Sequence, residues 1–246
     1  MSMFILGDGP LGWAVATALG ERAERAAVMG RPPTGTHDAA ALTGADLIVE
    51  ASRGRSVLPN LEAGLQAGCR RFVIATTGWD AVRPSVADRL LDAGATAVVA
   101  SNLSLGAALF LRLVSEAAEE AAALGGFEPA IVEWHRRAKA DRPSGTAREI
   151  VRRIERHLPI DMEEVAIVRS GAMPGHHTVA FDAAGETIEL RLTARDRSAY
   201  AAGALAAIDW LRATDRAPGI QPFDRVVDDL LERSRPPVDR PARPAA

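Results

Sequence analysis

The chain of 246 residues carries 29 basic and 32 acidic side chains, a formal net charge of −3, and 48% hydrophobic residues. This near-neutral balance gives no electrostatic reason to expect a nucleic acid or an anionic membrane as partner. No apolar run reaches the roughly 18–20 residues of a membrane span, and the first residues lack the basic segment of a signal peptide. The single Cys69 excludes an internal disulfide and a site built on several cysteines. These features predict a cytoplasmic protein with one large or two small domains.

Short apolar runs alternate with helical patterns over about the first hundred residues. Helices are expected up to about residue 19, over 57–67 and over 84–93; strands are expected over 3–6, 26–29, 46–50, 71–75 and 96–100. This alternation is typical of βαβ units and therefore of a Rossmann-like parallel sheet. Ligand-binding residues are then expected at the carboxyl ends of the strands.

The pattern changes after about residue 105. Helices are expected over 107–124, 144–158 and 199–212, and strands over 130–134, 165–169, 177–182 and 187–193. Strands that follow one another favour a mixed or antiparallel sheet. The predicted organisation is therefore α/β, with a dinucleotide-binding domain over 1–104 and 198–235, an α+β domain over 105–197, and a Pro- and Arg-rich disordered tail over 236–246.

A glycine-rich turn follows the first predicted strand and is formed by Gly7, Asp8, Gly9, Pro10, Leu11 and Gly12. Such a turn lets backbone N–H groups approach a pyrophosphate at a helix N-terminus, although a plain turn is the alternative. An NAD site usually carries an acidic residue after the second strand. This chain has Gly30 and Arg31 there, and an arginine suits the 2′-phosphate of NADPH unless it is an ordinary surface cation. The turn predicts a dinucleotide site, and Arg31 predicts NADPH as cofactor, with NADH possible.

A second motif covers residues 133–146 and holds Lys139, the lone lysine among 28 arginines, since lysine and arginine together number 29. A lysine pKa shifts on burial and its ammonium can donate a proton, which arginine cannot do. His135 can relay a proton near neutral pH. Ser144, Gly145 and Thr146 open a helix whose free N–H groups could bind a carboxylate, or they form a simple N-cap. Because the sequence predicts a strand followed by a loop here, only the fold can bring the side chains of His135 and Lys139 close together.

Residues 133–146 match the pattern E-x-H-H-x-x-K-x-D-x-P-S-G-T at every position but one, and so resemble the family of 4-hydroxy-tetrahydrodipicolinate (dihydrodipicolinate) reductases. Further stretches resemble the family in the same order along the chain. They are residues 75–78 and 100–104, the pair 169–171 and 175–178, Arg197 before 200–204, and Phe223 with Asp224.

The resemblance implies an NAD(P)H-dependent oxidoreductase that converts 4-hydroxy-tetrahydrodipicolinate to tetrahydrodipicolinate in diaminopimelate and lysine biosynthesis. It implies that His135 is the general acid/base, and that Lys139 contacts a substrate carboxylate and helps to protonate the ring. It also implies a homo-oligomer, tetramer or dimer, formed through the domain over 105–197. The implied substrate-binding residues are Arg136, Ser144, Gly145, Thr146 and Arg197, and the implied cofactor-binding residues are Gly7–Gly12, Arg31, Ala75, Thr76, Thr77, Ala100, Ser101, Asn102 and Leu103.

The chain departs from the family pattern in three places. Arg136 stands where the family has a second histidine, and the glycine turn is one residue shorter and lacks the family's arginine. The stretch between the first predicted helix and Asp46 is also shorter than in the family. Because of these departures, a related imine or carbonyl reductase on the same fold is an alternative function. A non-catalytic nucleotide-binding protein is a further alternative, against which the presence of both His135 and Lys139 counts. No metal is predicted, because His176 and His177, adjacent in a strand, point to opposite faces.

Overall fold

The computed structural model describes residues 2–32, 35–100 and 102–234, so the predicted tail over 236–246 and Ser101 lie outside the described residues. Its larger sheet has six strands in the order β10-β5-β4-β3-β1-β2, and every neighbouring pair is parallel. The strands are β1 (Ser2–Leu6), β2 (Ala26–Met29), β3 (Ala45–Glu50), β4 (Arg71–Ile74), β5 (Thr96–Val99) and β10 (Gly219–Pro222).

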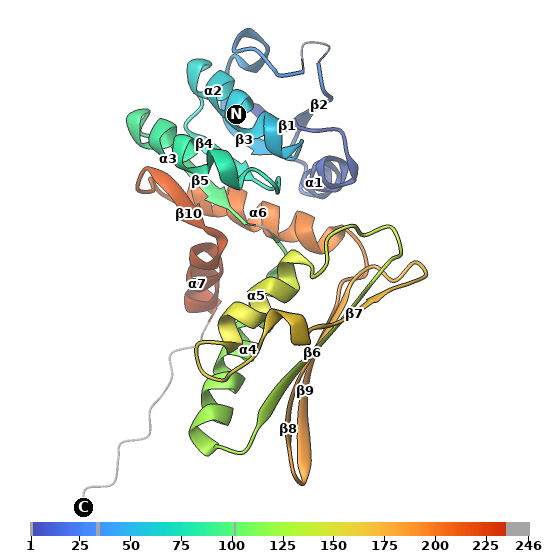
Figure 1. The fold of residues 1–246 in the computed structure, drawn as a ribbon. Coiled ribbons are helices and arrows are strands. Elements are labelled where there is room, and N and C mark those ends of the chain that lie inside the picture. The colour runs from blue at the N-terminus through green and yellow to red at the C-terminus, as the bar shows by residue number, and fades with distance from the viewer. Residues whose placement is uncertain (1, 33–34, 101, 235–246) are drawn as a thin grey trace, which may run out of the picture.

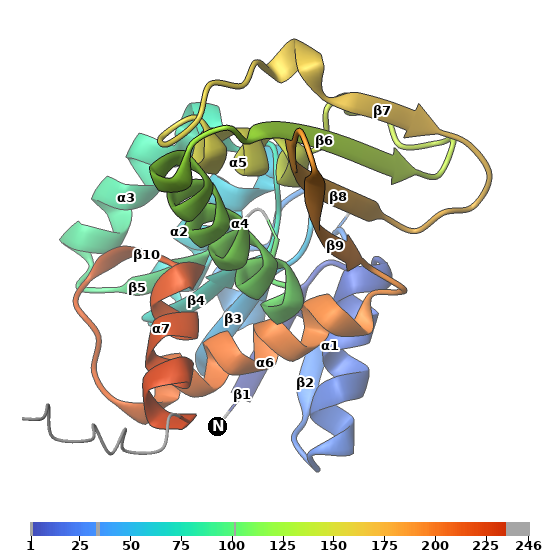
Figure 2. The same ribbon diagram turned by 90° about the horizontal axis from the view of Figure 1, so that it is seen from below.

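Helices cover both faces of the parallel sheet (Figures 1 and 2). Alternation along β3 divides its side chains between two cores, since Leu47 and Val49 face one core and Ile48 faces the other. Helices α1 (Pro10–Glu21), α6 (Ser198–Ala213) and α7 (Phe223–Ser234) pack on the first core, and α2 (Val57–Gln66) and α3 (Arg83–Asp92) pack on the second. Within the described part of the chain, no helix combines the length and the apolarity needed to cross a membrane.

The smaller sheet is mixed, with the strand order β7-β6-β8-β9. Strand β6 (Glu128–His135) pairs in parallel with β7 (Ala166–Arg169) and antiparallel with β8 (His176–Ala183), which pairs antiparallel with β9 (Glu186–Thr193). Helices α4 (Leu105–Leu124) and α5 (Gly145–Ile154) lie on one side of this sheet (Figure 1). Phe110, Ile150 and Phe181 share a buried core there.

The α/β architecture predicted from the sequence is confirmed, with its parallel sheet followed by a mixed sheet. Strand β10 was not predicted, because Gly-Ile-Gln-Pro is too short and too polar to stand out from a loop. For helix α7, no residue range was predicted from the sequence. Helix α5 ends at Ile154 rather than at residue 158, and Pro159 follows shortly afterwards, which disfavours helical geometry in the residue before it.

Candidate active site

The glycine turn lies where the topology of the parallel sheet reverses, between β1 and β3. Gly7 has a φ of +127°, and a Cβ at this position would overlap the carbonyl oxygen of Ala51, which follows β3. A Cβ at Gly12 would overlap the carbonyl oxygen of Gly7, so helix α1 packs directly on the turn. The carboxyl ends of β1 and β3 therefore meet at the crevice where α/β sheets bind their ligands.

The N-terminus of α1 offers the geometry that a pyrophosphate requires. Gly9 is the N-cap residue and Pro10 begins the helix. No side chain caps the first turn, and no atom lies within 4 Å of an ideal Cβ at Gly9. Free N–H groups and the positive end of the helix dipole favour an anion at such a position. These residues therefore fit a dinucleotide phosphate.

Two charged side chains stand beside the end of β2. The Asp8 carboxylate lies over Gly30, with its Oδ2 atom 2.8 Å from an ideal Cβ there. The Arg31 guanidinium is exposed and reaches toward Gly35. A side chain at position 30 would displace Asp8, so the glycine makes room for an acidic group that comes from the turn after β1. The expected arginine and a carboxylate thus occur together at the end of β2.

A hydrogen-bonded network fixes the loops after β3 and β4. The buried Glu50 carboxylate accepts hydrogen bonds from Ser52, from the Asn60 amide at 2.7 Å and from the Thr76 hydroxyl at 3.2 Å. Burial raises the pKa of Glu50 above its ordinary value, although these hydrogen bonds oppose the effect. The Thr76 side chain is engaged in this network, whereas Thr77 is exposed at the sheet edge.

The loop after β5 touches the second motif. Asn102 donates from Nδ2 to the Thr146 hydroxyl at 3.3 Å, and its Oδ1 atom accepts from the Ser104 backbone N–H at 2.9 Å. Leu103 is buried, and the absence of a side chain at Gly203 lets α6 pack against the Leu103 carbonyl. The structure therefore brings Asn102, a predicted cofactor-binding residue, and Thr146, a predicted substrate-binding residue, together.

The segment 133–146 is a strand followed by a loop, as predicted. Strand β6 ends at the buried His135, and Arg136 after it is exposed. The Lys139 Nζ atom lies 2.8 Å from Asp141 Oδ1 and 3.0 Å from Asp141 Oδ2. Ser144 is the N-cap of α5, and its Oγ atom accepts from the Ala147 backbone N–H. The simple N-cap considered for Ser144 is thus present, while Gly145 and Thr146 occupy the first turn of the helix.

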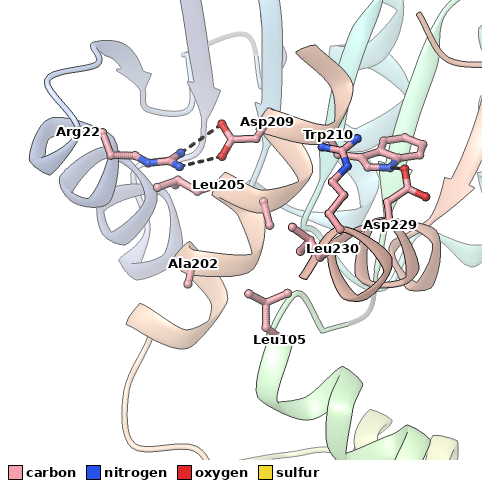
Figure 3. Close-up of a pocket in the computed structure, with 10 residues that line it drawn as sticks. Arg22, Leu105, Ala202, Leu205, Asp209, Trp210, Asp229 and Leu230 are labelled. Atoms are coloured by element: carbon pink, nitrogen blue, oxygen red, sulfur yellow. Dashed lines mark hydrogen bonds and ion pairs between the residues drawn. The ribbon is translucent and has the colours of Figure 1, made fainter. Parts of the chain in front are cut away.

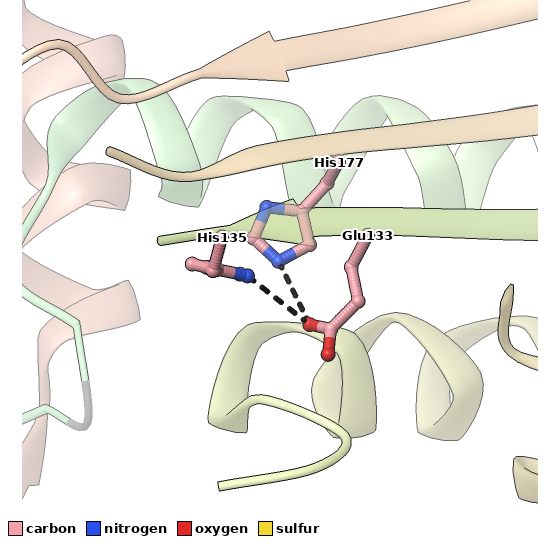
Figure 4. A group of neighbouring side chains, drawn as sticks. All are labelled: Glu133, His135 and His177. Carbon is pink, nitrogen blue, oxygen red and sulfur yellow. Dashed lines mark ion pairs between the residues drawn. The ribbon is translucent and has the colours of Figure 1, made fainter. Parts of the chain in front are cut away.

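Three buried side chains meet behind this loop, and all three point toward one another in Figure 4. His135 Nδ1 lies 3.7 Å from Glu133 Oε2, and His177 Nε2 lies 3.6 Å from the same oxygen. The two imidazole rings meet edge to face with centroids 5.1 Å apart. His177 Nε2 also lies 3.1 Å from the Ser144 Oγ atom. The three residues thus form a contact network around one carboxylate oxygen.

The other contacts of Glu133 are with hydrogen-bond donors. Arg169 Nη2 donates to Glu133 Oε1 at 2.5 Å, and the Ser144 backbone N–H lies 3.1 and 3.2 Å from the two carboxylate oxygens. Burial alone would raise the pKa of Glu133, but hydrogen bonds from His177, Ser144 and Arg169 outweigh it and hold the pKa well below its ordinary range. Burial and the neighbouring His177 lower the pKa of His135 to about 4. At neutral pH the cluster holds an anionic glutamate beside a neutral His135.

Sequence reasoning missed the partnership of Glu133 with His177 and Arg169. The rule that His176 and His177 face opposite sides holds, since His177 is buried and His176 is bonded to Thr178 on the outer face. Period-two alternation in β6 could have placed Glu133 and His135 on one face. The antiparallel register that sets Glu133 against His177 could not have been read from the sequence.

Arg197 and a cavity between three helices lie apart from this cluster. The Arg197 guanidinium is 5.5 Å from the centroid of the Tyr200 ring, and the residue precedes α6 as an exposed side chain. A cavity of about 380 Å³ opens between α1, α6 and α7, where Arg22 and Asp209 form an ion pair (Figure 3). Among the described residues that line it, none belongs to the predicted site. This cavity is therefore not the predicted site.

Comparison with known proteins identifies the family. The model of the family "Dihydrodipicolinate reductase, C-terminus" matches residues 106–227. A 4-hydroxy-tetrahydrodipicolinate reductase of Archaeoglobus fulgidus is 32% identical over 207 residues, which cover 76% of each chain. The chain belongs to the 4-hydroxy-tetrahydrodipicolinate reductase family. The family member of Thiobacillus denitrificans is 34% identical over 204 residues, covering 74% of this chain and 73% of its own.

A solved member of the 4-hydroxy-tetrahydrodipicolinate reductase family shares the fold. The dipicolinate-bound dihydrodipicolinate reductase from Paenisporosarcina sp. TG-14 superposes with a TM-score of 0.71, covering 90% of this chain and 97% of its own, at 20% identity. The resemblance predicted from residues 133–146 is thereby confirmed, and the chain is an oxidoreductase that uses a nicotinamide cofactor.

Proposed function

We propose that this chain reduces 4-hydroxy-tetrahydrodipicolinate to tetrahydrodipicolinate with NADPH as the preferred hydride donor. The observation that carries the proposal is the hydrogen bond between Asn102 and Thr146, which holds the motif 133–146 against the carboxyl edge of the parallel sheet. Hydride donor and dicarboxylated ring would then meet between the loop after β5 and the first turn of α5. Family membership supports the same reaction.

The residues of the motif have separate tasks in this proposal. The free N–H groups at the start of α5 and the Thr146 hydroxyl bind one carboxylate of the ring, as helix N-termini bind anions. The Lys139 ammonium, now paired with Asp141, takes a carboxylate of the substrate as its partner. His135 exchanges a proton with the substrate, and its low pKa keeps it neutral and able to accept one.

The overall reaction balances with one hydride and one proton. Loss of the 4-hydroxyl group as water leaves an unsaturated ring, and the nicotinamide cofactor supplies two electrons and a hydrogen as hydride. The remaining proton comes from an acid of the chain, for which the Lys139 ammonium is the candidate, because the low pKa of His135 leaves that imidazole neutral at working pH. The reaction consumes one proton per turnover, so the acid must be recharged from solvent through the loop over 136–143.

The cofactor preference rests on the end of β2. Arg31 supplies a guanidinium for a 2′-phosphate. The carboxylate of Asp8 lies nearby and would accept a hydrogen bond from a ribose hydroxyl. A 2′-phosphate carries negative charge, and Arg31 offsets the repulsion from Asp8. Both groups together support NADPH as preferred donor and leave NADH usable.

The partner of the smaller sheet is proposed to be a second copy of the chain, as the resemblance implied. Val132 and Trp134 of β6 and Val168 of β7 lie next to one another on the outer face and are 37–40% exposed. Three neighbouring apolar side chains on an open sheet are typical of a buried interface. The domain organisation predicted from the sequence, with residues 105–197 serving oligomerisation, is kept on this basis.

Arg136 favours one alternative within the same chemistry. Where the family pattern has histidine, an exposed guanidinium follows the catalytic strand. Arginine binds a carboxylate through a fixed fork but does not titrate. A related imine or carbonyl reductase with a differently placed carboxylate in its substrate is therefore the second candidate.

A coupled assay separates the two candidates. The upstream condensation product is generated in place by the synthase, and oxidation of NADPH is followed optically. We expect turnover of the dicarboxylated ring and at least a tenfold lower kcat/KM for simple cyclic imines without a second carboxylate. Absence of NADPH and NADH oxidation with the dicarboxylated ring would refute the proposed reaction, and a preference for simple imines would favour the alternative.

A further inference from the structure

We propose that Glu133 is a positioning residue that fixes the tautomer of His135 and holds the substrate-binding turn at Ser144 to the same carboxylate. The inference deepens the proposed function and rests on it for the identity of the reaction. It gives a task to a buried acidic side chain that touches neither the predicted cofactor loops nor the predicted substrate residues other than the Ser144 backbone.

Glu133 is enclosed and its charge is compensated. Its side chain is 0% exposed and that of Arg169 is 1% exposed, so the ion pair is shielded from water. The Ser144 N–H lies within hydrogen-bonding distance of both carboxylate oxygens. Buried charges occur where they are paired and hydrogen-bonded in this way. The carboxylate is therefore a fixed negative charge in the cluster.

The fixed charge distinguishes the two nitrogens of His135. Nδ1 is buried without a hydrogen-bond partner and faces Glu133 Oε2 at 3.7 Å. The opposite edge of the ring faces Gly175, where an ideal Cβ would be 3.3 Å from Nε2. A carboxylate favours a hydrogen on the nitrogen that faces it, since the tautomer follows the partner of the second nitrogen. His135 then carries its hydrogen on Nδ1 and exchanges the catalytic proton at Nε2.

The same carboxylate connects this ring to the substrate turn. Ser144 donates its backbone N–H to Glu133, and its Oγ atom caps α5 and contacts His177 Nε2. A shift of Glu133 would therefore move the first turn of α5 and the His135 ring together. One side chain thus sets both the proton-transfer group and the proposed carboxylate-binding turn.

A metal ion is a poorer interpretation of the same cluster. Glu133, His135 and His177 place three ligand atoms within 4.8 Å of one another. However, the Arg169 guanidinium contacts one oxygen of the carboxylate, and the Ser144 N–H approaches both oxygens. A cation between the imidazoles would face the positive charge of Arg169. The contacts therefore fit a hydrogen-bonded network and not a metal centre.

The test is the tautomer of His135, read from the nitrogen-15 shifts of its imidazole in the ligand-free protein at neutral pH. The groups that face this ring are Glu133 on its own strand, His177 on β8, Arg169 on β7 and Lys139 in the following loop. We expect the Nδ1–H form in the wild-type protein and a shift toward Nε2–H in Glu133→Gln. The matched control is Glu128→Gln, which makes the same change at the exposed first residue of β6 and should leave the tautomer as in wild type.

Turnover supplies a second reading. In Glu133→Gln we expect kcat to fall about 10- to 100-fold, part of the usual contribution of general acid–base catalysis, with the affinity for NADPH within twofold of wild type. A merely structural role would lower the thermal midpoint without moving the tautomer. A wild-type protein that does not turn over the dicarboxylated ring would refute the proposed reaction, and the tautomer would still be measurable.

The single variant leaves Arg169 without its partner and could fail to fold for that reason. The double variant Glu133→Gln with Arg169→Gln removes both charges and keeps hydrogen-bonding amides at both positions. We expect it to fold and to show the same loss of the Nδ1–H form. A folded variant that keeps the wild-type tautomer, an Nε2–H form in the wild-type protein, or tight Zn²⁺ binding that is lost in Glu133→Gln would each overturn the proposal.

Discussion

Asn102 and Thr146 are 44 positions apart in the chain, and a hydrogen bond of 3.3 Å joins the amide of the first to the hydroxyl of the second. Asn102 follows the last strand of the first βαβ series, and Thr146 lies in the first turn of α5. The bond therefore ties the proposed nicotinamide side of the site to the proposed carboxylate side. Through this contact, we expect the cofactor held at the parallel sheet to be placed next to the substrate held at the start of α5.

A double-mutant cycle on Asn102→Ala and Thr146→Val measures this coupling. Each single change should lower kcat/KM. The coupling free energy should be about 0.5–1.5 kcal/mol, the usual net contribution of one hydrogen bond. The substrate KM is expected to rise more than kcat falls, because the bond places the carboxylate-binding turn. Strictly additive effects of the two changes would show that the loops act independently.

The single lysine provides a sharp prediction. Lys139→Arg keeps the charge and the salt bridge to Asp141, yet we expect kcat to fall at least ~100-fold, because guanidinium does not release a proton at working pH. The control is Arg137→Lys, an exposed cation two residues earlier, which should leave steady-state rates unchanged. Near-wild-type turnover in Lys139→Arg would remove Lys139 from proton transfer.

Gly7 and Gly9, two of the three glycines of the turn, should respond differently to alanine. Gly7→Ala forces a residue with a Cβ to adopt a φ of +127° against the Ala51 carbonyl, so we expect a loss of about 1–3 kcal/mol in the free energy of unfolding from backbone strain alone. Gly9→Ala has open space and an ordinary φ of −77°. It should unfold like wild type in urea but bind NADPH more weakly in a fluorescence titration, because its methyl group stands where the phosphate approaches.

The proposed 2′-phosphate contact is tested by Arg31→Ala. Loss of a charge-assisted hydrogen bond of about 1.5–3 kcal/mol should raise the dissociation constant for NADPH at least about tenfold and leave that for NADH nearly unchanged. Arg25→Ala is the control, since Arg25 is exposed and precedes β2 whereas Arg31 follows it. Equal losses for both cofactors in Arg31→Ala would point to a role away from the 2′-phosphate.

Stability should depend on pH through His135. The pKa of this group is about 4 in the folded chain and has the ordinary value of 6.5 in the unfolded chain. The unfolded state therefore binds more protons between these values, and the free energy of unfolding falls as the pH is lowered from 6.5 toward 4. The depressed pKa of Glu133 acts at lower pH, because its contribution is lost only below its unfolded value of 4.5.

Urea unfolding at pH 7 and pH 5 of the wild-type protein and of His135→Asn isolates this effect. His37 and His176 also have lowered pKa values, and they contribute equally to the pH dependence of stability in both proteins. We expect the difference between the two pH values to be smaller in the variant. Identical differences in the two proteins would mean that His135 is not responsible.

Much of the fold could be predicted because its signals are local. Apolar runs of four to six residues mark the strands of the parallel sheet, and the glycine turn marks the first crossover. The PSGT stretch marks the start of α5. Strand β10 could not be predicted, because it forms by a long-range pairing with β5 and its four residues carry no clear strand pattern of their own. For the same reason Glu133 was not recognised, since its partners Arg169 and His177 come from two other strands.

The parallel sheet is interrupted in the chain by the mixed sheet, and this has a consequence for synthesis on the ribosome. Helix α6 supplies Leu205, Ile208 and Trp210 to the core on one face, and β10 covers the edge of β5 only afterwards. A nascent chain that ends before residue 198 therefore presents an apolar sheet surface and an open strand edge, which are the features that promote aggregation. The segment from α6 to α7 completes the first folded unit, so that unit stays unprotected until this segment has been synthesised.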